Sequence, residues 1–388
     1  MRGARIHRLS SVVILSWALG AGGRTAFAQP AAANPAALTA ELQRIITEEV
    51  AANPGLPGEL LHVHAPAHGL DVSLAAGVFD RKSGRPLDPH HAFRVASVTK
   101  TFTAASILRL MEEGRLGLDD PVSRHLPADY VALLRADGYA VEEITIRHLL
   151  MHTSGIHDYA TDQRYFAAVF GDPVRRWTRM EQVRAAMEWG QPRFAPGAGY
   201  HYSDTGYVLL GEIIERLTGQ PMGQAFRTLI GYERLGLDET WLESLEPAPA
   251  GVELSHPYFQ DQDAFGIDAS VDLYGGGGLA SSVEDLARFY RALLRGEVFE
   301  RPSTLQAMLT IPPTNQQSPG GPYGMGIQRR MIGGHECWGH TGFWGTAAHH
   351  CPGPDVTIVR HYNQAETDGS FIFRALYDRV VQALGISR

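Results

Sequence analysis

The sequence predicts an α/β fold of the α+β kind: an antiparallel sheet flanked by N- and C-terminal helices, with a mainly helical domain inserted between the two halves of the sheet. Strand patterns lie near both ends of the chain, whereas the middle has mostly the apolar period of helices. A length of 388 residues suits two packed domains. We therefore expect a sheet domain made of residues 37–96 and 297–388, and a helical domain made of residues 97–296.

The first 28 residues have the parts of a secretory signal. Arginines at positions 2, 5 and 8 precede an apolar run from Val12 to Gly20, and Ala26-Phe27-Ala28 is a small-x-small cleavage site. The run is short for a membrane span, and a retained anchor is the alternative. We expect residues 1–28 to be removed and residues 29–36 to form a linker. The mature chain would then be periplasmic or secreted, without a stable membrane anchor.

Charge excludes one class of partner and draws attention to one residue. The formal net charge is −8, and removal of a signal with four arginines and no acid makes it −12. Neither nucleic acid nor an anionic lipid surface is therefore an expected partner.

Of the 34 basic residues only two are lysines, Lys82 and Lys100. Lysine, unlike arginine, can give up its proton inside a protein. No Gly-Lys-Ser/Thr sequence occurs, which excludes a P-loop.

The expected elements begin with a helix that Asn34 caps and Pro35 opens, with one apolar face formed by Leu38, Leu42, Ile45, Ile46 and Val50. Strands follow at residues 60–65, 70–79 and 92–95. A mostly apolar helix then runs from Ser97 to Glu113 and ends at Gly114. Further helices are expected at residues 146–151, 180–189, 204–217 and 283–294.

Strand patterns return near the C-terminal end. Residues 323–329, 335–341, 346–351 and 356–362 are expected to form an antiparallel meander. A last helix over residues 371–384 would carry Ile372, Leu376, Val380 and Leu384 on one face.

Ser97 and Lys100 are candidates for nucleophilic catalysis. Their spacing of three places both side chains on one helix face, one turn apart. Ser97 lies at the helix N-terminus, where free N–H groups and the helix dipole would stabilise an alkoxide or an acyl oxyanion. A partly buried lysine at this place could accept the serine proton. The alternative is that Ser97 only caps the helix.

Two further segments are weaker candidates by themselves. Tyr202 stands in a loop before a helix and could serve as a phenolate base beside a lysine, although Ser203 and Asp204 are also ordinary helix caps. Residues 338–342 form a glycine-rich strand end before the turn 343–345, where a substrate backbone could come close. An ordinary hairpin is the alternative for this segment.

Together these segments resemble a known family. Ser97-x-x-Lys100, Tyr202-x-Asp204 and His340-Thr341-Gly342 have the order and spacing of the three motifs of penicillin-recognising serine enzymes, the serine β-lactamase and penicillin-binding-protein-like family. That family includes class C β-lactamases, D-alanyl-D-alanine carboxypeptidases and β-lactamase-like esterases. Segments 93–96, 149–155 and 277–282 are similar to secondary motifs of the family, so the resemblance spans residues 60–362.

The resemblance implies a β-lactamase/transpeptidase-like fold and acyl transfer through a serine ester. Ser97 would be the nucleophile, and Lys100 with Tyr202 would move its proton. Substrate would contact the residues that fill the matching positions, Asp204, His340, Thr341, Gly342 and Phe343. The N–H groups of Ser97 and Phe343 would form the oxyanion hole. No cofactor or metal is implied.

Two departures from the family pattern affect the expected substrate. The second motif usually ends in Asn, and this chain has Asp204; the third usually begins with Lys, and this chain has His340. If the motifs converge, the Asp204 carboxylate should lie near the Lys100 ammonium, and proton abstraction would fall mainly to Tyr202. We favour a D-alanyl-D-alanine carboxypeptidase-like peptidase, then a carboxylesterase, then a class C-like β-lactamase. A peptide, ester or β-lactam is the expected small partner.

Two other classes of protein compete with this interpretation. A metal enzyme is suggested by His62-Val63-His64 and His68, but no His-Glu-x-x-His sequence occurs. A penicillin-binding receptor that is acylated and never turns over would carry the same motifs. An α/β-hydrolase is excluded, because no Gly-x-Ser-x-Gly occurs.

Cys337 and Cys351 are the only cysteines, which in an exported protein suggests one disulfide. If the turn at residues 343–345 is centred on Trp344, both cysteines lie seven positions from it and face each other across the hairpin. The bond would brace the strand that carries residues 340–342. Two free buried thiols are the alternative.

Overall fold

The computed structural model describes residues 34–365 and 372–387. The expected signal segment, residues 1–28, and most of the expected linker lie outside the described residues. Helix α1 (Pro35–Ala52) begins inside the range expected for that linker, with the Asn34 side chain accepting the Ala36 N–H as the predicted cap. In the described part of the chain, no helix has the length and apolar character needed to cross a bilayer.

One antiparallel six-stranded sheet forms the base of the fold, with the strand order β2-β1-β11-β10-β9-β8. It consists of β1 (Gly58–Ala65), β2 (Leu70–Gly77), β8 (Gln328–Ile332), β9 (His335–Gly342), β10 (Thr346–Cys351) and β11 (Val356–Tyr362). The register pairs Leu60 with His361, so the N-terminal hairpin and the C-terminal meander meet in the middle of the sheet. The prediction that both ends of the chain build one antiparallel sheet is confirmed.

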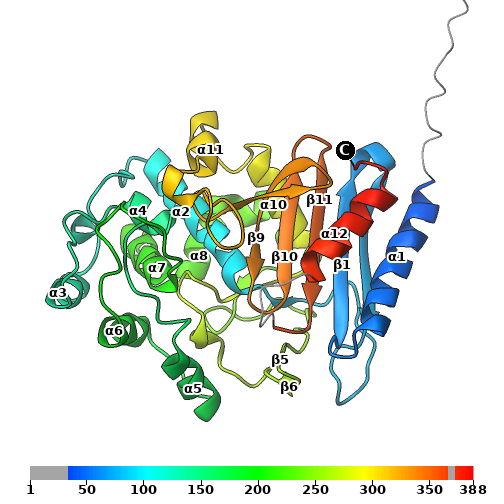
Figure 1. The fold of residues 1–388 in the computed structure, drawn as a ribbon, viewed down its shortest axis with the longest axis horizontal. Helices are drawn as coiled ribbons and strands as arrows, with labels where there is room; N and C mark the ends of the chain where they lie inside the picture. The colour runs from blue at the N-terminus through cyan, green and yellow to red at the C-terminus, as the bar shows by residue number, and fades with distance from the viewer. Residues whose placement is uncertain (1–33, 366–371, 388) are drawn as a thin grey trace, which may run out of the picture. The chain divides into compact units, whose positions relative to one another are not determined.

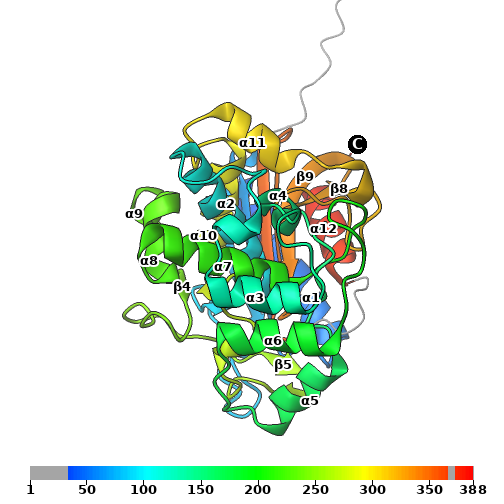
Figure 2. The same ribbon diagram turned by 90° about the vertical axis from the view of Figure 1, so that its left-hand side faces the viewer.

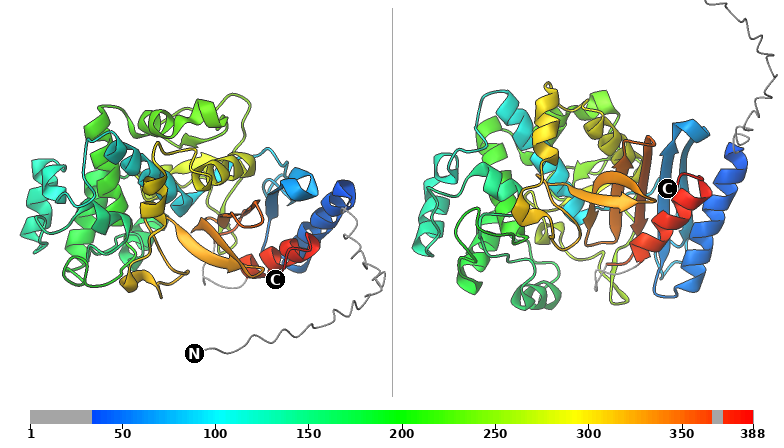
Figure 3. Two further views of the ribbon diagram at one scale, coloured as in Figure 1. Left: turned by 90° about the horizontal axis from the view of Figure 1, so that it is seen from above. Right: turned by 45° about the horizontal axis from the view of Figure 1, so that its top comes forward.

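The two terminal helices cover one face of this sheet. Helix α1 lies beside α12 (Ile372–Ala383) in Figures 1 and 3, and both contact the sheet. Leu38, Leu42, Ile45 and Ile46 of the predicted face are buried, and so are Leu376, Val380 and Leu384. Val50 is only half-buried, because the neighbouring Glu49 turns inward to pair with the buried Arg360.

The opposite face carries the helical part of the chain. Helix α10 (Val283–Leu294) lies directly on β1, β10 and β11, although its residues fall within the range expected for the helical domain. The helices that extend away from the sheet are α2 (Thr99–Glu112), α3 (Ala128–Ala136), α4 (Ile146–Leu150), α5 (Gln163–Gly171), α6 (Arg179–Trp189), α7 (Asp204–Thr218), α8 (Met222–Phe226), α9 (Tyr232–Leu235) and α11 (Pro302–Leu309). Figure 2 shows α3, α6 and α5 one below another on the side away from the sheet.

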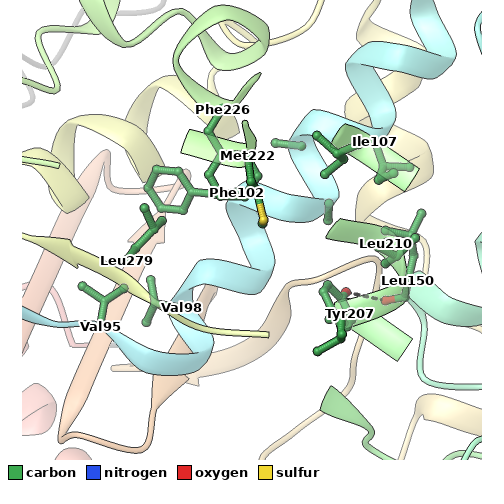
Figure 4. Packing of buried hydrophobic residues seen from close by; sticks show 14 of the residues in the cluster. Val95, Val98, Phe102, Ile107, Leu150, Tyr207, Leu210, Met222, Phe226 and Leu279 are labelled. Carbon is green, nitrogen blue, oxygen red and sulfur yellow. Dashed lines mark hydrogen bonds between the residues drawn. The ribbon is translucent and has the colours of Figure 1, made fainter. Parts of the chain in front are cut away.

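Helix α2 lies in the hydrophobic core on the helical side of the sheet. Phe102 lies among side chains from several other segments in Figure 4, and its ring stacks on that of Phe289 from α10 at 3.7 Å between centroids. The Tyr207 hydroxyl of α7 donates to the Leu150 carbonyl oxygen at the end of α4, at 2.7 Å. α2 and α7 also contact each other directly, and both helices are buried along most of their length.

Two predicted elements need correction. The strand expected at residues 323–329 begins only at Gln328, because residues 323–326 turn against α2 instead. Gly326 lies at φ +68°, and a Cβ there would be 2.6 Å from the Ala104 Cβ, so the segment is too close to the helix for a ladder. The strand expected at residues 92–95 is the short β3 (Phe93–Arg94), which pairs with β7 (Leu279–Ser281) and not with the main sheet. β7 also pairs with β4 (Trp241–Leu242), and β5 (Tyr258–Phe259) pairs with β6 (Gln262–Asp263).

Helices α3, α5, α8, α9 and α11 are absent from the sequence prediction, because each has fewer than ten residues and too few turns to establish a period. The described residues from Asn34 onward form one compact unit by their contacts. The division into residues 37–96 with 297–388 and residues 97–296 stays an interpretation of the sequence.

Candidate active site

Ser97 stands in a tight turn between β3 and α2. A 3₁₀ turn over Ala96–Val98 leads into the helix, and Ala96 has a φ of +47°, a left-handed conformation that costs about 1–3 kcal/mol in a residue with a Cβ. The turn lies against the end of β9, where a Cβ at Gly342 would be only 2.1 Å from the Val95 carbonyl oxygen. Ser97 caps no helix, since the α2 cap is Val98.

Lys100 reaches back from α2 to the serine. Its Nζ donates to the Ser97 Oγ at 3.0 Å and to the Gly276 carbonyl oxygen at 2.7 Å, and it forms an ion pair with Asp204. The side chain is completely buried. Three acceptors match the three N–H donors of an ammonium group. The prediction that the Asp204 carboxylate lies near Lys100 is confirmed.

Tyr202 lies on the other side of the ammonium group, with its ring centre 4.9 Å from Nζ. Burial, and next the charge of Asp204, raise the pKa of the Tyr202 phenol well above its usual value, while a hydrogen bond with Ser97 acts in the opposite direction. Tyr202 is therefore a neutral phenol at rest.

Asp204 is the first residue of α7 and not its cap. Ser203 occupies the cap position and its side chain makes no capping hydrogen bond. The Asp204 N–H donates to Asp158 Oδ1 at 2.8 Å. Burial, and then the Asp204 charge, raise the pKa of Asp158 to about 6. The alternative that Asp204 merely caps the helix is wrong, because its carboxylate contacts Lys100.

A cavity of about 230 Å³ opens in front of these side chains. Ser97, Tyr202, Asp204 and Phe343 line it, so the structure brings half of the eight predicted site residues to one cavity. The wall is otherwise mostly apolar and aromatic, and it consists of Ala96, Ala160, Thr161, Tyr165, Phe166, Val169, Phe170, Ile267, Val271, Asp272, Gly276 and Trp344.

Asp272 is a second acid on this wall that sequence reasoning missed. Within the described part of the chain, no hydrogen bond or ion pair reaches its carboxylate. Burial raises its pKa to about 7, with the charge of Arg94 acting in the opposite direction and that of Asp204 adding to the rise. The run of glycines at 275–278 was its only sequence signal: a Cβ at Gly277 would be 2.6 Å from the Asp272 carboxylate.

The third predicted motif and the Phe343 that follows it, residues 340–343, are divided between the cavity and the interior. Phe343 lines the cavity, whereas His340 is buried on β9 with its Nε2 3.0 Å from the Tyr323 hydroxyl. His340 was expected to bind substrate, but it does not line the cavity. Thr341 is half-buried, and its carbonyl oxygen is 2.6 Å from His340 Nδ1. Burial, with a smaller contribution from the Lys100 charge, lowers the pKa of His340 to about 3.

The histidines that suggested a metal enzyme have other partners. His62 and His64 both contact Asp71 Oδ1, at 3.2 and 3.3 Å. Among the described residues, no group of three or more His, Cys, Asp or Glu side chains is arranged to hold a metal ion.

The structure joins Cys337 to Cys351 by a disulfide between β9 and β10, with the Cα atoms 4.1 Å apart. The register pairs Trp338 with His350 and His340 with Ala348, which places the two cysteines opposite each other. Formation of the bond in the exported protein stays a prediction.

Comparisons with known proteins identify relatives of this chain. Penicillin-binding protein 4* of Bacillus subtilis (strain 168) is 28% identical over 305 residues, which are 75% of this chain and 62% of the relative. Esterase EstB of Burkholderia gladioli is 36% identical over 195 residues, 48% of this chain and 47% of the relative. The chain thus spans less than two thirds of the length of these curated relatives.

Solved structures match over almost their whole length. A D-stereospecific amidohydrolase from Streptomyces sp. has 30% identity and a TM-score of 0.72, with 89% of this chain and 97% of that chain covered. The D-amino acid amidase from Ochrobactrum anthropi SV3, complexed with D-phenylalanine, has 26% identity and a TM-score of 0.76, with coverages of 91% and 100%. The family model named Beta-lactamase matches residues 49–383, and the chain therefore belongs to the Beta-lactamase family.

Proposed function

We propose that the protein is a serine hydrolase that works through an acyl-enzyme. The observation that carries the proposal is the Ser97 Oγ on the cavity wall, 3.0 Å from the Lys100 Nζ and hydrogen-bonded to Tyr202. The Oγ would attack a carbonyl carbon and form an ester, while its proton passes to the Lys100–Tyr202 pair. That proton would go to the leaving nitrogen or oxygen as its bond to the carbonyl breaks, and water would then hydrolyse the ester by the reverse steps.

The oxyanion that forms in each step needs two N–H donors. The N–H groups of Ser97 and Phe343 are our candidates, since both residues line the cavity and Gly342 holds the end of β9 against Val95. A larger residue at position 342 would force these segments apart. Loss of one such donor slows a reaction by about 10²–10³.

The cavity favours an acyl group with a large apolar side chain and a positive charge. Phe166 and Phe343 line the cavity from two different segments, with their ring centres 6.1 Å apart. Phe259 does not line the cavity but supports both rings, at 6.2 and 5.9 Å between centres. Asp204 and Asp272 add two carboxylates. Among the described residues no hydrogen bond or ion pair reaches the Asp272 carboxylate, and a substrate ammonium could supply one. The described residues that line the cavity include no lysine or arginine.

These features rank the possible substrates. We favour amides, esters or short peptides of an apolar amino acid with a free amine. The names of the structural relatives, a D-stereospecific amidohydrolase and a D-amino acid amidase, suggest the D configuration. The D-alanyl-D-alanine carboxypeptidase-like peptidase predicted from the sequence becomes the second candidate, supported by the match to penicillin-binding protein 4*. Its peptide ends in a carboxylate, for which the cavity wall offers no cation.

The remaining candidates follow from the same features. A carboxylesterase is supported by the match to EstB. A class C-like β-lactamase ranks lower, because ionised Asp204 cannot donate to the acylamino carbonyl of the drug. A receptor that never turns over would form the acyl-enzyme and keep it.

A panel of substrates with intact-mass detection tests the proposal. We would compare D- and L-phenylalanine amide, a D-Ala-D-Ala peptide, a p-nitrophenyl ester and a cephalosporin, with wild type and with Ser97→Ala. We expect fastest turnover of an amino-acid amide, and neither turnover nor a mass adduct with Ser97→Ala. An adduct on the variant would refute Ser97 as nucleophile, and an adduct that never decays on wild type would indicate the receptor.

Location and partners are proposed on the same basis. We infer an exported protein, periplasmic or secreted, with a small-molecule or peptide substrate and no nucleic acid partner. The basic start, apolar run and cleavage site of residues 1–28 support this inference. Cell fractionation, with the N-terminal sequence of the recovered chain, would test it: a cytoplasmic chain that begins at Met1 would contradict it.

A further inference from the structure

His152, Tyr323 and His340 form a buried row behind the candidate active site. The Tyr323 hydroxyl lies 3.0 Å from His340 Nε2 and 3.3 Å from His152 Nε2. None of the three side chains is more than 1% exposed, and none lines the cavity. They come from three distant places in the chain: the end of α4, the turn before β8, and β9.

Both ends of the row terminate in backbone groups of the candidate site. At one end the Ser203 N–H donates to His152 Nδ1 at 3.1 Å. At the other end His340 Nδ1 is 2.6 Å from the Thr341 carbonyl oxygen. Ser203 stands between Tyr202 and Asp204, and Thr341 precedes Gly342. The row therefore joins the second predicted motif to the third.

The two end groups determine every proton in between. An N–H can only donate, so His152 Nδ1 accepts and the ring proton of the neutral imidazole is on Nε2. A carbonyl oxygen can only accept, so His340 carries its proton on Nδ1 and its Nε2 accepts. Tyr323 must then accept from His152 Nε2–H and donate its own proton to His340 Nε2. Tyr207, whose own proton goes to the Leu150 carbonyl oxygen, also hydrogen-bonds the Tyr323 hydroxyl from outside the row. Along the row itself each group accepts once and donates once, in one direction.

The surroundings agree with two neutral rings. Burial lowers the pKa of His152 well below its usual value, and the nearby Lys100 ammonium lowers it further, as it does for His340. A proton added to either ring would place a donor where the row requires an acceptor.

The row also packs against Tyr202, the side chain that hydrogen-bonds Ser97. The His152 ring centre is 4.2 Å from that of Tyr202, and the His201 N–H donates to the His152 carbonyl oxygen at 2.9 Å. His152 itself has a φ of +58°, a left-handed conformation that is uncommon in residues other than glycine. Asn315 fixes the far side, where its Nδ2 donates to the Met151 and Tyr323 carbonyl oxygens.

We propose that His152, Tyr323 and His340 are positioning residues that form one directed hydrogen-bond chain from the Ser203 N–H to the Thr341 carbonyl oxygen. This hydrogen-bond chain sets the position of Tyr202 relative to the end of β9, and these two parts of the site lie on opposite sides of Ser97. His340 thus serves the reaction from the interior and does not hold substrate. Only the kinetic part of the test rests on the proposed hydrolase function.

The direct test is the tautomer of each ring. In protein labelled with ¹⁵N-histidine at pH 7, we expect His152 to be the Nε2–H tautomer and His340 the Nδ1–H tautomer, with the signals assigned from His152→Gln and His340→Gln. Tyr323→Phe should leave both tautomers unchanged, because the backbone partners of both Nδ1 atoms remain, but it should shift the signals of both Nε2 atoms, which lose their partner. Two equal tautomers, or an imidazolium at either position, would overturn the proposal whether or not the protein is a hydrolase.

The kinetic test uses p-nitrophenyl acetate and the rate of labelling of Ser97 by a fluorophosphonate. Tyr323→Phe should lower kcat about 10²-fold, the cost of a misplacement near 1 Å, and change KM less than about twofold. Tyr232→Phe removes a buried hydroxyl that has no hydrogen bond among the described residues and should leave both rates unchanged.

Position 340 separates positioning from substrate binding. Gln can accept the Tyr323 proton in place of Nε2, so His340→Gln should retain about tenfold more activity than His340→Ala, both by kcat. If His340 instead bound substrate, both variants would raise KM and leave Ser97 labelling at the wild-type rate. That result, or loss of kcat in Tyr232→Phe equal to that in Tyr323→Phe, would overturn the proposal.

Discussion

Asp204→Asn changes one charge beside both groups that are to move the serine proton. The carboxylate pairs with the Lys100 ammonium and, after burial, is the largest cause of the raised pKa of Tyr202. The amide has nearly the same shape and can still accept a hydrogen bond, but it carries no charge. Because Asp204 is not the cap of α7, the substitution removes no capping bond.

The size of the effect follows from Coulomb's law. Nζ is 4.9 Å from the Tyr202 ring centre and in contact with the carboxylate. A unit charge about 7 Å from the phenol, at an effective dielectric of about 20, contributes about 2.4 kcal/mol. That energy corresponds to about 1.7 pH units. Loss of the negative charge lowers the pKa of the phenol and, through the coupled pair, the pH at which the pair can accept a proton.

The assay is the pH dependence of kcat/KM for an ester and for a penicillin. The acid limb, where activity rises with pH, should move about one to two units to lower pH in Asp204→Asn. The new amide can also donate to an acylamino carbonyl, worth about 0.5–1.5 kcal/mol, so penicillin hydrolysis should rise about two- to tenfold relative to ester hydrolysis.

A matched control is Asp129→Asn, which neutralises an exposed acid in the first turn of α3. It should leave the pH profile and the substrate ratio at wild-type values. If the Asp204→Asn profile also superimposed on that of wild type, with equal penicillin hydrolysis, the coupling between Asp204 and the Lys100–Tyr202 pair would be refuted.

Three further predictions concern single features of the site. Lys100→Arg should lower kcat at least about 10³-fold without unfolding the protein, because a guanidinium cannot give up its proton; labelling of Ser97 at the wild-type rate would contradict this. Gly342→Ala should slow acyl-enzyme formation about 10²-fold or more by forcing β9 from Val95, measured by rapid-quench mass spectrometry, and equal rates would show that the turn can yield. Titration of the unfolded, unreduced exported protein should find no free thiol, and Cys337→Ser with Cys351→Ser should lower the free energy of unfolding by about 3 kcal/mol; two titrated thiols would exclude the disulfide.

Local sequence signals predicted the elements that carry the nucleophile. The apolar helix after Ser97, its end at Gly114 and the helix after Asp204 each depend on residues within a few positions, namely caps, glycines and a period of 3.6. The hairpin also followed from local symmetry around Trp344, which gave the register that places Cys337 opposite Cys351. Such features can be predicted without knowledge of any distant contact.

The features that the sequence did not predict depend on distant contacts. Tyr323 meets His340 and His152 only because residues 323–326 turn away from the strand expected there and lie against α2. The aromatic wall likewise needs α5 and the β9–β10 turn to meet. Asp272 carries no motif of its own, and its raised pKa comes mainly from burial, which is a property of the folded chain alone.

The two departures from the family pattern change the charge of the site in the same direction. Asp204 adds a negative charge beside Lys100, and His340 is neutral where a lysine is usual, so the ammonium of Lys100 is the only cation among the predicted site residues and is already paired. Asp272 is a further acid on the cavity wall, and because burial raises its pKa to about 7, a bound cation would favour its ionised form. An anionic ligand would therefore meet repulsion, while a cationic one would be attracted, by about 2 kcal/mol for one charge at the distances and dielectric used above.

Two boronic acids of equal size, one with an ammonium group and one with a carboxylate, test this charge balance, since boron binds the serine oxygen in both. The ammonium compound should inhibit at least tenfold better, and Asp272→Asn should reduce its advantage. Stronger inhibition by the carboxylate compound would show that the site selects anions, as a carboxypeptidase or a β-lactamase must.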